Sequence, residues 1–188
     1  MIGALPRLLN VAGVDYPIRS DFRVILNIFE AFNDTELSDA DKTTVMLKSL
    51  YFTFSDIPTE HIQEAAEKAM WFLDGGDAPK TKTDGLKTFD WKQDEAIMFP
   101  AINKVAGYET RSCNYLHWWT FLGFFNETGE GLFSTVMAIR NKRMRGKKLD
   151  DWEKEFYKTH KDLINLYTEQ DKKEIAETEE FVKRLLGE

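Results

Sequence analysis

Residues 115–125 read Tyr-Leu-His-Trp-Trp-Thr-Phe-Leu-Gly-Phe-Phe, and this segment is the most unusual in the chain. At about 100° per residue, its apolar side chains cover nearly the whole surface of a helix. Such a helix is either buried at the centre of a protein or exposed for a partner. We expect a core helix that is capped by Ser112 and runs to about Phe125. Its second face, around Leu116 and Phe124, is the alternative: a docking surface for another protein's helix.

Helical spacing of apolar residues continues on both sides of this segment. Ser38 and Asp41 have the spacing of a capping box, which marks a helix start. Pro100 falls inside one predicted helix and should kink or split it, because proline lacks the N–H that a helix interior requires. The segment 76–87 is rich in turn formers and lacks apolar periodicity, so we expect a mobile loop there. The predicted helices cover about 20–32, 38 onward, 59–73, 90–105, 131–143, 150–167 and 171–186, with the last two able to join.

The N-terminal residues have a different pattern. Two short apolar runs flank Ala12-Gly13, a pair suited to a tight turn because glycine readily takes a positive φ. Pro17 has no backbone donor, so the second run must be an edge strand or the end of a strand. The apolar residues of the runs are Leu8, Leu9, Val11, Val14, Tyr16 and Ile18. We therefore predict a mainly α fold: a multi-helix bundle over 20–167, a small β-hairpin over 1–19 packed on it, and an amphipathic helical extension over 168–188.

Composition narrows the class of protein. The 188 residues include 25 Lys and Arg against 32 Asp and Glu, a net charge of −7, which disfavours coating nucleic acid or an anionic membrane. No apolar run approaches the roughly 20 residues of a membrane helix. A single cysteine, Cys113, excludes an internal disulfide framework and favours a reducing cytosol. We expect an acidic intracellular protein with no nucleic-acid or membrane partner.

Cys113 and His117 are the clearest candidates for chemistry, because a spacing of four places both on one helix face. Zinc sites need three or four such ligands, and the other histidines, His61 and His160, stand on separate predicted helices. A cysteine nucleophile needs a base and an orienting group, and the sequence shows neither beside Cys113. We therefore expect no catalytic residue, no metal site, no cofactor and no enzymatic activity.

Two charged segments each allow two interpretations. Six basic residues fall between positions 140 and 148. They either contact nucleic acid or follow the preference for cations at a helix C-terminus, and the acidic residues directly after them favour the second. The segment 150–188 is amphipathic with an acidic outer face. It either packs on the bundle or contacts a neighbouring subunit.

Several short motifs occur together along the chain. In order, they are Leu5-Pro6, Val11-x-Gly13-x-x-Tyr16-Pro17-Ile18, Ser20-Asp21-Phe22-Arg23, Trp71-Phe72 ahead of Gly75-Gly76, Phe89-Asp90-Trp91, Tyr115-Leu116-His117-Trp118-Trp119 and Met137-Ala138-Ile139-Arg140. In this order and spacing they resemble the bacteriophage gene-product-fifteen family of long-tailed phages that infect Gram-positive bacteria. The resemblance covers about positions 5–165, and the Tyr-Leu-His-Trp-Trp string is its most specific part. The segment after Tyr167 has no counterpart in it.

The resemblance implies a small helical protein that is encoded beside the tape-measure gene and acts in tail assembly. Members are thought to be tail assembly chaperones, which bind the tape-measure protein and keep it soluble while tail-tube subunits assemble around it. The implied partners are the tape-measure protein and the tail-tube protein, and the chain would act as a homo-oligomer or fused to an upstream chaperone partner. Its implied location is the host bacterial cytoplasm, with absence from the mature virion.

A chaperone for a long helical chain needs apolar grooves that accept amphipathic helices, and an acidic exterior that keeps the complex dissolved. Our candidates for the partner-binding residues are Leu116, Trp118, Trp119 and Phe124. The predicted loop over 76–87 could become ordered on binding. The competing hypothesis is a structural tail or connector subunit that remains in the virion, and an enzyme is the weakest of the three because no set of acid, base and nucleophile can be named.

Overall fold

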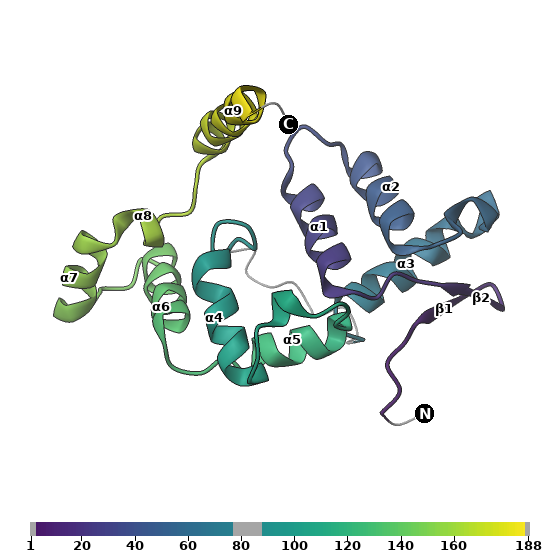
Figure 1. Ribbon diagram of the computed structural model, residues 1–188, viewed down its shortest axis with the longest axis horizontal. Helices are drawn as coiled ribbons and strands as arrows, with labels where there is room; N and C mark the ends of the chain where they lie inside the picture. The colour runs from purple at the N-terminus through teal and green to yellow at the C-terminus, as the bar shows by residue number, and fades with distance from the viewer. Residues whose placement is uncertain (1–2, 77–87, 187–188) are drawn as a thin grey trace. The chain divides into compact units, whose positions relative to one another are not determined.

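The computed structural model of the chain describes residues 3–76 and 88–186, and it is mainly helical (Figure 1). It confirms the predicted fold class, because an antiparallel hairpin precedes a series of helices. The chain divides into two compact units. The first comprises residues 1–85 and 97–130, and the second comprises residues 86–96 and 131–188. The predicted mobile loop lies outside the described residues, except for Gly76.

The N-terminal hairpin forms where it was predicted. Strands β1 (Leu8–Val11) and β2 (Val14–Pro17) pair antiparallel, with Leu9 opposite Tyr16. Ala12 and Gly13 both have positive φ, 49° and 84°, which is the geometry of a type I′ turn. Leu9, Val11 and Tyr16 are buried, and β1 packs beside the third helix, so the hairpin is part of the first unit's core.

The helices of the first unit enclose an aromatic core. They are α1 (Phe22–Asn33), α2 (Asp39–Leu50), α3 (Ile62–Leu73), α4 (Glu95–Ala106) from Ile97 onward, and α5 (Trp118–Asn126). Short 3-10 turns lie at Phe54–Asp56, Thr59–His61 and Thr110–Ser112. Phe22 of α1 stacks on Phe121 of α5 with ring centroids 4.4 Å apart, and Phe99 of α4 tilts against both rings. Large rings from three helices therefore meet at one point, which fixes how these helices pack.

Side-chain caps explain where two of these helices begin. Ser38 caps α2: its hydroxyl accepts from the Asp41 N–H while the Asp41 carboxylate accepts from the Ser38 N–H, which confirms the predicted capping box. Ser20, at the start of the first predicted helix, is expected to cap it, and this prediction is wrong by one residue. Asp21 caps α1 by accepting from the Arg23 N–H, and the hydroxyl of Ser20 instead pairs with the Tyr115 hydroxyl at 2.8 Å.

The prediction that Ser112 starts the aromatic helix is also wrong. Helix α5 begins at Trp118, and residue His117 is its N-cap. Residues before it stay extended because they bond to the start of α1: the Leu116 N–H donates to the Asp21 carboxylate, and the Phe22 N–H donates to the Leu116 carbonyl. These bonds replace the helical ones that a start at Ser112 would require. Cys113 and His117 therefore do not share a helix face.

The second unit contains residues 88–96 and helices α6 (Leu132–Met144), α7 (Asp151–Thr159), α8 (Lys161–Ile164) and α9 (Glu169–Leu186). Arg140 of α6 holds it together. Its guanidinium forms a bidentate ion pair with Asp94, with N···O distances of 2.6 and 2.8 Å, and both side chains are almost fully buried. The same group donates to the carbonyls of Thr88, Leu163 and Ile164. One arginine thereby joins three separate segments of this unit.

Three predicted helix boundaries in this part of the chain are wrong. The predicted helix over 150–167 is divided at His160, and it ends at Ile164, where Arg140 takes the last two carbonyls. The predicted helix over 90–105 starts only at Glu95, because the Asp90 carboxylate accepts two backbone N–H groups in a turn. Helix α4 continues through Pro100 to Ala106, so the proline does not split it.

Candidate functional site

The two tryptophans of α5 hold the end of α3. The indole N–H of Trp118 donates to the Leu73 carbonyl, and that of Trp119 donates to the Phe72 carbonyl, both at 2.9 Å. The last carbonyls of a helix have no partner within the helix, so these bonds satisfy them. Trp118 is buried, while Trp119 is half-buried.

The four residues predicted to bind a partner lie in different environments. Leu116 and Trp118 are buried in the core of the first unit, at 7% and 1% exposure. Phe124 is half-buried, with its ring edge-on to Tyr108 at 6.3 Å. Without rearrangement a partner can reach only Trp119 and Phe124 of the four, so the partner-binding prediction narrows to these two.

Trp119 connects α5 to the exposed side of α3. Its ring lies edge-on to Trp71 at 5.3 Å, and Trp71 is 38% exposed. The turn after α3 fits closely against the same ring, because a Cβ added at Gly76 would lie 2.6 Å from it. Gly76 also has a φ of +86°, which L side chains rarely adopt. The end of α3 is therefore tightly fixed to α5.

His117, the N-cap residue of α5, is a titratable group. Its Nδ1 accepts from the Trp119 N–H at 3.0 Å, so Nε2 is the protonated nitrogen that donates to the Pro6 carbonyl at 2.9 Å. Burial lowers the pKa of His117 below its usual 6.5; the bond to Pro6 opposes this effect and the charge of Arg7 adds to it. The imidazole is therefore held neutral, and both of its nitrogens are used in structural bonds.

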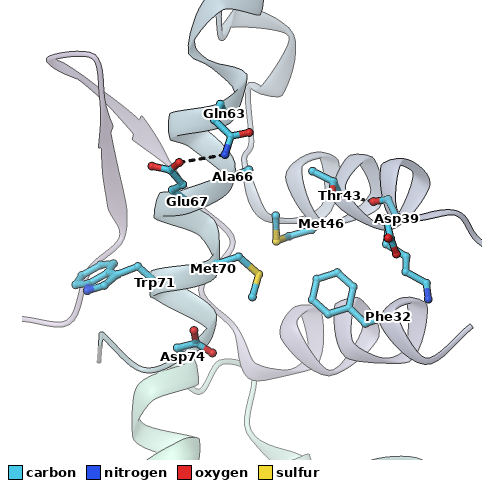
Figure 2. A pocket seen from close by; sticks show the side chains of 11 residues that line it. Phe32, Asp39, Thr43, Met46, Gln63, Ala66, Glu67, Met70, Trp71 and Asp74 are labelled. Carbon is cyan, nitrogen blue, oxygen red and sulfur yellow. Dashed lines mark hydrogen bonds between the residues drawn. The ribbon is translucent and has the colours of Figure 1, made fainter. Parts of the chain in front are cut away.

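An open apolar groove lies between α3 and helices α1 and α2. Figure 2 shows Phe32 of α1, Met46 of α2 and Met70 of α3 directed toward one another across it. Met46 is buried, but Met70 is 40% exposed, so the groove opens to solvent on the α3 side. Its volume is about 650 Å³, within the range of pockets that take large apolar ligands.

The rim of the groove is mainly acidic. Among its lining residues, three carboxylates, from Asp39, Glu67 and Asp74, accompany one amine, from Lys42. Glu67 also accepts from the Gln63 amide at 3.0 Å, one turn away on α3 (Figure 2). An apolar floor with acidic edges is complementary to a helix that has an apolar stripe flanked by lysine or arginine.

This groove could not be predicted directly from the sequence. Met46 is one of the apolar positions of the predicted helix that begins at Ser38, and Trp71 belongs to the Trp71-Phe72 motif, but neither pattern indicates a groove. The groove exists because the packing of α1, α2 and α3 leaves Phe32 half-buried and Met70 40% exposed along it. A methionine exposed on the outer flank of a predicted helix was the one signal that could have indicated it.

The residues considered for metal or nucleophilic chemistry are dispersed. Among the residues that the structure describes, no group of three His, Cys, Asp or Glu side chains is placed to hold a metal ion. Cys113 is a half-buried free thiol at the end of the 3-10 turn Thr110–Ser112, and it does not share a helix with His117. In the basic segment 140–148, Arg140 is buried in the second unit, and Lys142 pairs with Asp150 and Glu153.

These features define a small, mainly helical protein with an N-terminal hairpin and an open, methionine-lined groove. Within the described residues, no helix has the length and apolar character needed to cross a bilayer. The chain belongs to the family described as Bacteriophage Gp15 protein, whose family model matches residues 1–166. Comparisons with curated proteins and with solved structures find no match. The family confirms the resemblance seen in the sequence, and it leaves α9 outside the matched region.

Proposed function

We propose that this chain is a phage tail assembly chaperone, which binds the tape-measure protein and keeps it soluble while tail-tube subunits assemble around it. The observation that supports the proposal best is the open apolar groove between α1, α2 and α3. A phage protein with such a groove can cover an apolar stripe that would otherwise aggregate. We further propose that it acts without catalysis in the host cytoplasm and does not remain in the virion.

The lining of the groove suits a long and varied partner. Unbranched methionine side chains adapt to different apolar groups, and Met46 and Met70 face each other across the groove. An amphipathic helix presents apolar side chains at positions i, i+3, i+4 and i+7, so one or two of them can enter. Such a site can accept successive segments of one helical chain, because it does not require a unique sequence.

Charge at the rim adds a preference. Asp39, Glu67 and Asp74 favour helices whose apolar stripe is bordered by lysine or arginine, since opposite charges speed the encounter and select the partner. Helices whose apolar stripe is bordered by aspartate or glutamate are disfavoured, because the three carboxylates repel them. The proposed target is therefore a basic amphipathic helix of the tape-measure protein.

Each binding event is expected to be weak. Full burial of a side chain such as methionine contributes about 1.5–3 kcal/mol, and less than half of Met70 remains to be buried. This contact therefore adds about 1 kcal/mol. Several copies bound along one chain would together keep it soluble, while single sites stay weak enough for tail-tube subunits to displace them.

Co-expression with the tape-measure protein tests the proposal. We expect the wild-type chain to increase soluble tape-measure protein and to co-purify with it. Met70→Asp should reduce both by about tenfold, because it places a charge in the apolar groove. Val105→Asp is the matched control, since Val105 is similarly exposed on a helix of the same unit. Equal solubility with and without the wild-type chain would refute the chaperone function, and equal loss in both variants would refute the role of the groove.

The structural alternative predicts a different location for the protein. Mass spectrometry of purified virions should find few or no peptides of this chain if it is a chaperone. Abundant peptides, in stoichiometry with known tail subunits, would instead establish a tail or connector subunit.

A further inference from the structure

Helix α9 (Glu169–Leu186) exposes an apolar stripe, interrupted at Thr178, that the family does not explain, because the family match ends at residue 166. Ile175, Val182 and Leu186 are spaced by seven and four residues, which places them on one helix face. They are 36%, 44% and 70% exposed; Phe181, about 100° round the helix from Val182, is 62% exposed. A helix whose apolar face is this exposed gains free energy when another surface covers it.

The stripe begins at a hollow. Tyr167, before the helix, and Glu174, Ile175 and Thr178 of the helix line a surface depression of about 420 Å³. Asp171 also lines the depression. Its carboxylate accepts a hydrogen bond from the Thr168 N–H at 2.7 Å, and this bond caps the start of the helix. The capped helix start therefore presents a shallow depression with both apolar and acidic side chains, large enough for side chains of another helix.

Charge is segregated along α9, so a second copy of the same helix offers it a complementary surface. In the sequence, residues 169–180 carry six acidic and two basic residues, whereas residues 181–186 carry Lys183 and Arg184 and no acidic residue. A second α9 in parallel orientation would set like charges side by side. In antiparallel orientation, the basic end of each helix lies beside the acidic part of the other.

We propose that α9 is a self-association helix, which pairs antiparallel with α9 of a second copy of this chain. The stripe of Ile175, Val182 and Leu186 forms the apolar seam, and Lys183 and Arg184 of each copy lie beside acidic residues of the other. Eighteen residues span about 27 Å, so the interface is short and the dimer depends on concentration. This inference does not rest on the proposed chaperone function, although a dimer would present two grooves to one partner chain.

Sedimentation equilibrium of the full chain over a wide concentration range tests the pairing. We expect a monomer–dimer equilibrium for the wild-type chain, and a dissociation constant at least tenfold higher for Val182→Asp. Trp152→Asp is the matched control, because Trp152 is an exposed apolar residue of α7 at 59% exposure, and this variant should dimerise like the wild type. A wild-type chain that stays monomeric at all concentrations, or a dimer that Val182→Asp leaves unchanged, would overturn the proposal.

Charge reversal tests the orientation. The double variant Lys183→Glu with Arg184→Glu should weaken an antiparallel dimer at least tenfold, because acidic ends would then lie beside acidic segments. The same change leaves a parallel dimer nearly unaltered, since two like-charged ends face each other before and after it. Unchanged affinity would therefore refute the antiparallel pairing, and raised salt should bring the dissociation constants of this variant and the wild type closer together.

Discussion

Replacing Arg140 by methionine should selectively destabilise the second unit. The guanidinium makes two bonds to the Asp94 carboxylate and further bonds to the carbonyls of Thr88, Leu163 and Ile164. Methionine keeps much of the apolar stem but none of these donors. The Asp94 side chain, only 1% exposed, would then be a buried carboxylate without its cation.

Removing one partner of a buried ion pair costs about 3–5 kcal/mol. Because the chain forms two compact units, the loss should be local, so hydrogen exchange resolved by peptide is the suitable assay. Amides of α6 should exchange roughly 150- to 5,000-fold faster, which is 3–5 kcal/mol at 1.36 kcal/mol per tenfold. Amides of α3 in the first unit should be unaffected.

Two further variants make this prediction sharper. Arg143→Met is the matched control, since Arg143 lies on the same helix but contacts Tyr157 and Asn165 near the surface, and it should cost less than about 1 kcal/mol. Adding Asp94→Asn to Arg140→Met should recover part of the loss, because no unpaired charge then remains buried. An acceleration below tenfold for Arg140→Met alone would refute the reasoning.

Three other outcomes are expected. His117→Asn should keep the cap of α5 but remove a pH dependence of stability. Burial lowers the pKa of His117 in the folded chain, so the unfolded chain takes up a proton first as the pH falls. The free energy of unfolding of the wild type, measured by urea titration at several pH values, should therefore fall below about pH 6.5, and that of the variant should change less. Gly76→Ala should lower the free energy of unfolding by about 2 kcal/mol, because of the positive φ and the contact with Trp119, and an unchanged denaturation midpoint would contradict this. Phe124 does not line the groove, so Phe124→Asp tests whether the contact with the tape-measure protein extends to α5: it should weaken the complex at unchanged helix content by circular dichroism, whereas global unfolding would assign Phe124 to the core.

Features set by neighbouring residues could be predicted from the sequence. The Ala12-Gly13 turn and the Ser38–Asp41 capping box depend on a few adjacent side chains, and both occur where their local chemistry places them. The start of α5 could not be predicted in this way. It depends on Asp21, far away in the chain, which binds the Leu116 N–H and keeps the preceding backbone extended.

The groove and the buried ion pair were missed for a similar reason. Arg140 looked like one member of a basic segment, because the sequence does not show that Asp94 and the carbonyls of Leu163 and Ile164 converge on it. In the sequence, Met70 is one more apolar residue of the predicted helix over 59–73. Its role as a groove wall arises only from the packing of α3 beside α1 and α2 (Figure 2).

The methionine lining makes the groove sensitive to oxidants. Met70 is 40% exposed and Met46 only 2%, so peroxide should convert the first thioether to a sulfoxide well before the second. A sulfoxide is polar and would stand in the groove that is proposed to receive apolar side chains of a partner. Protein treated with peroxide should therefore lose the proposed binding of amphipathic helices while keeping its fold, and methionine sulfoxide reductases for both epimers should restore that binding.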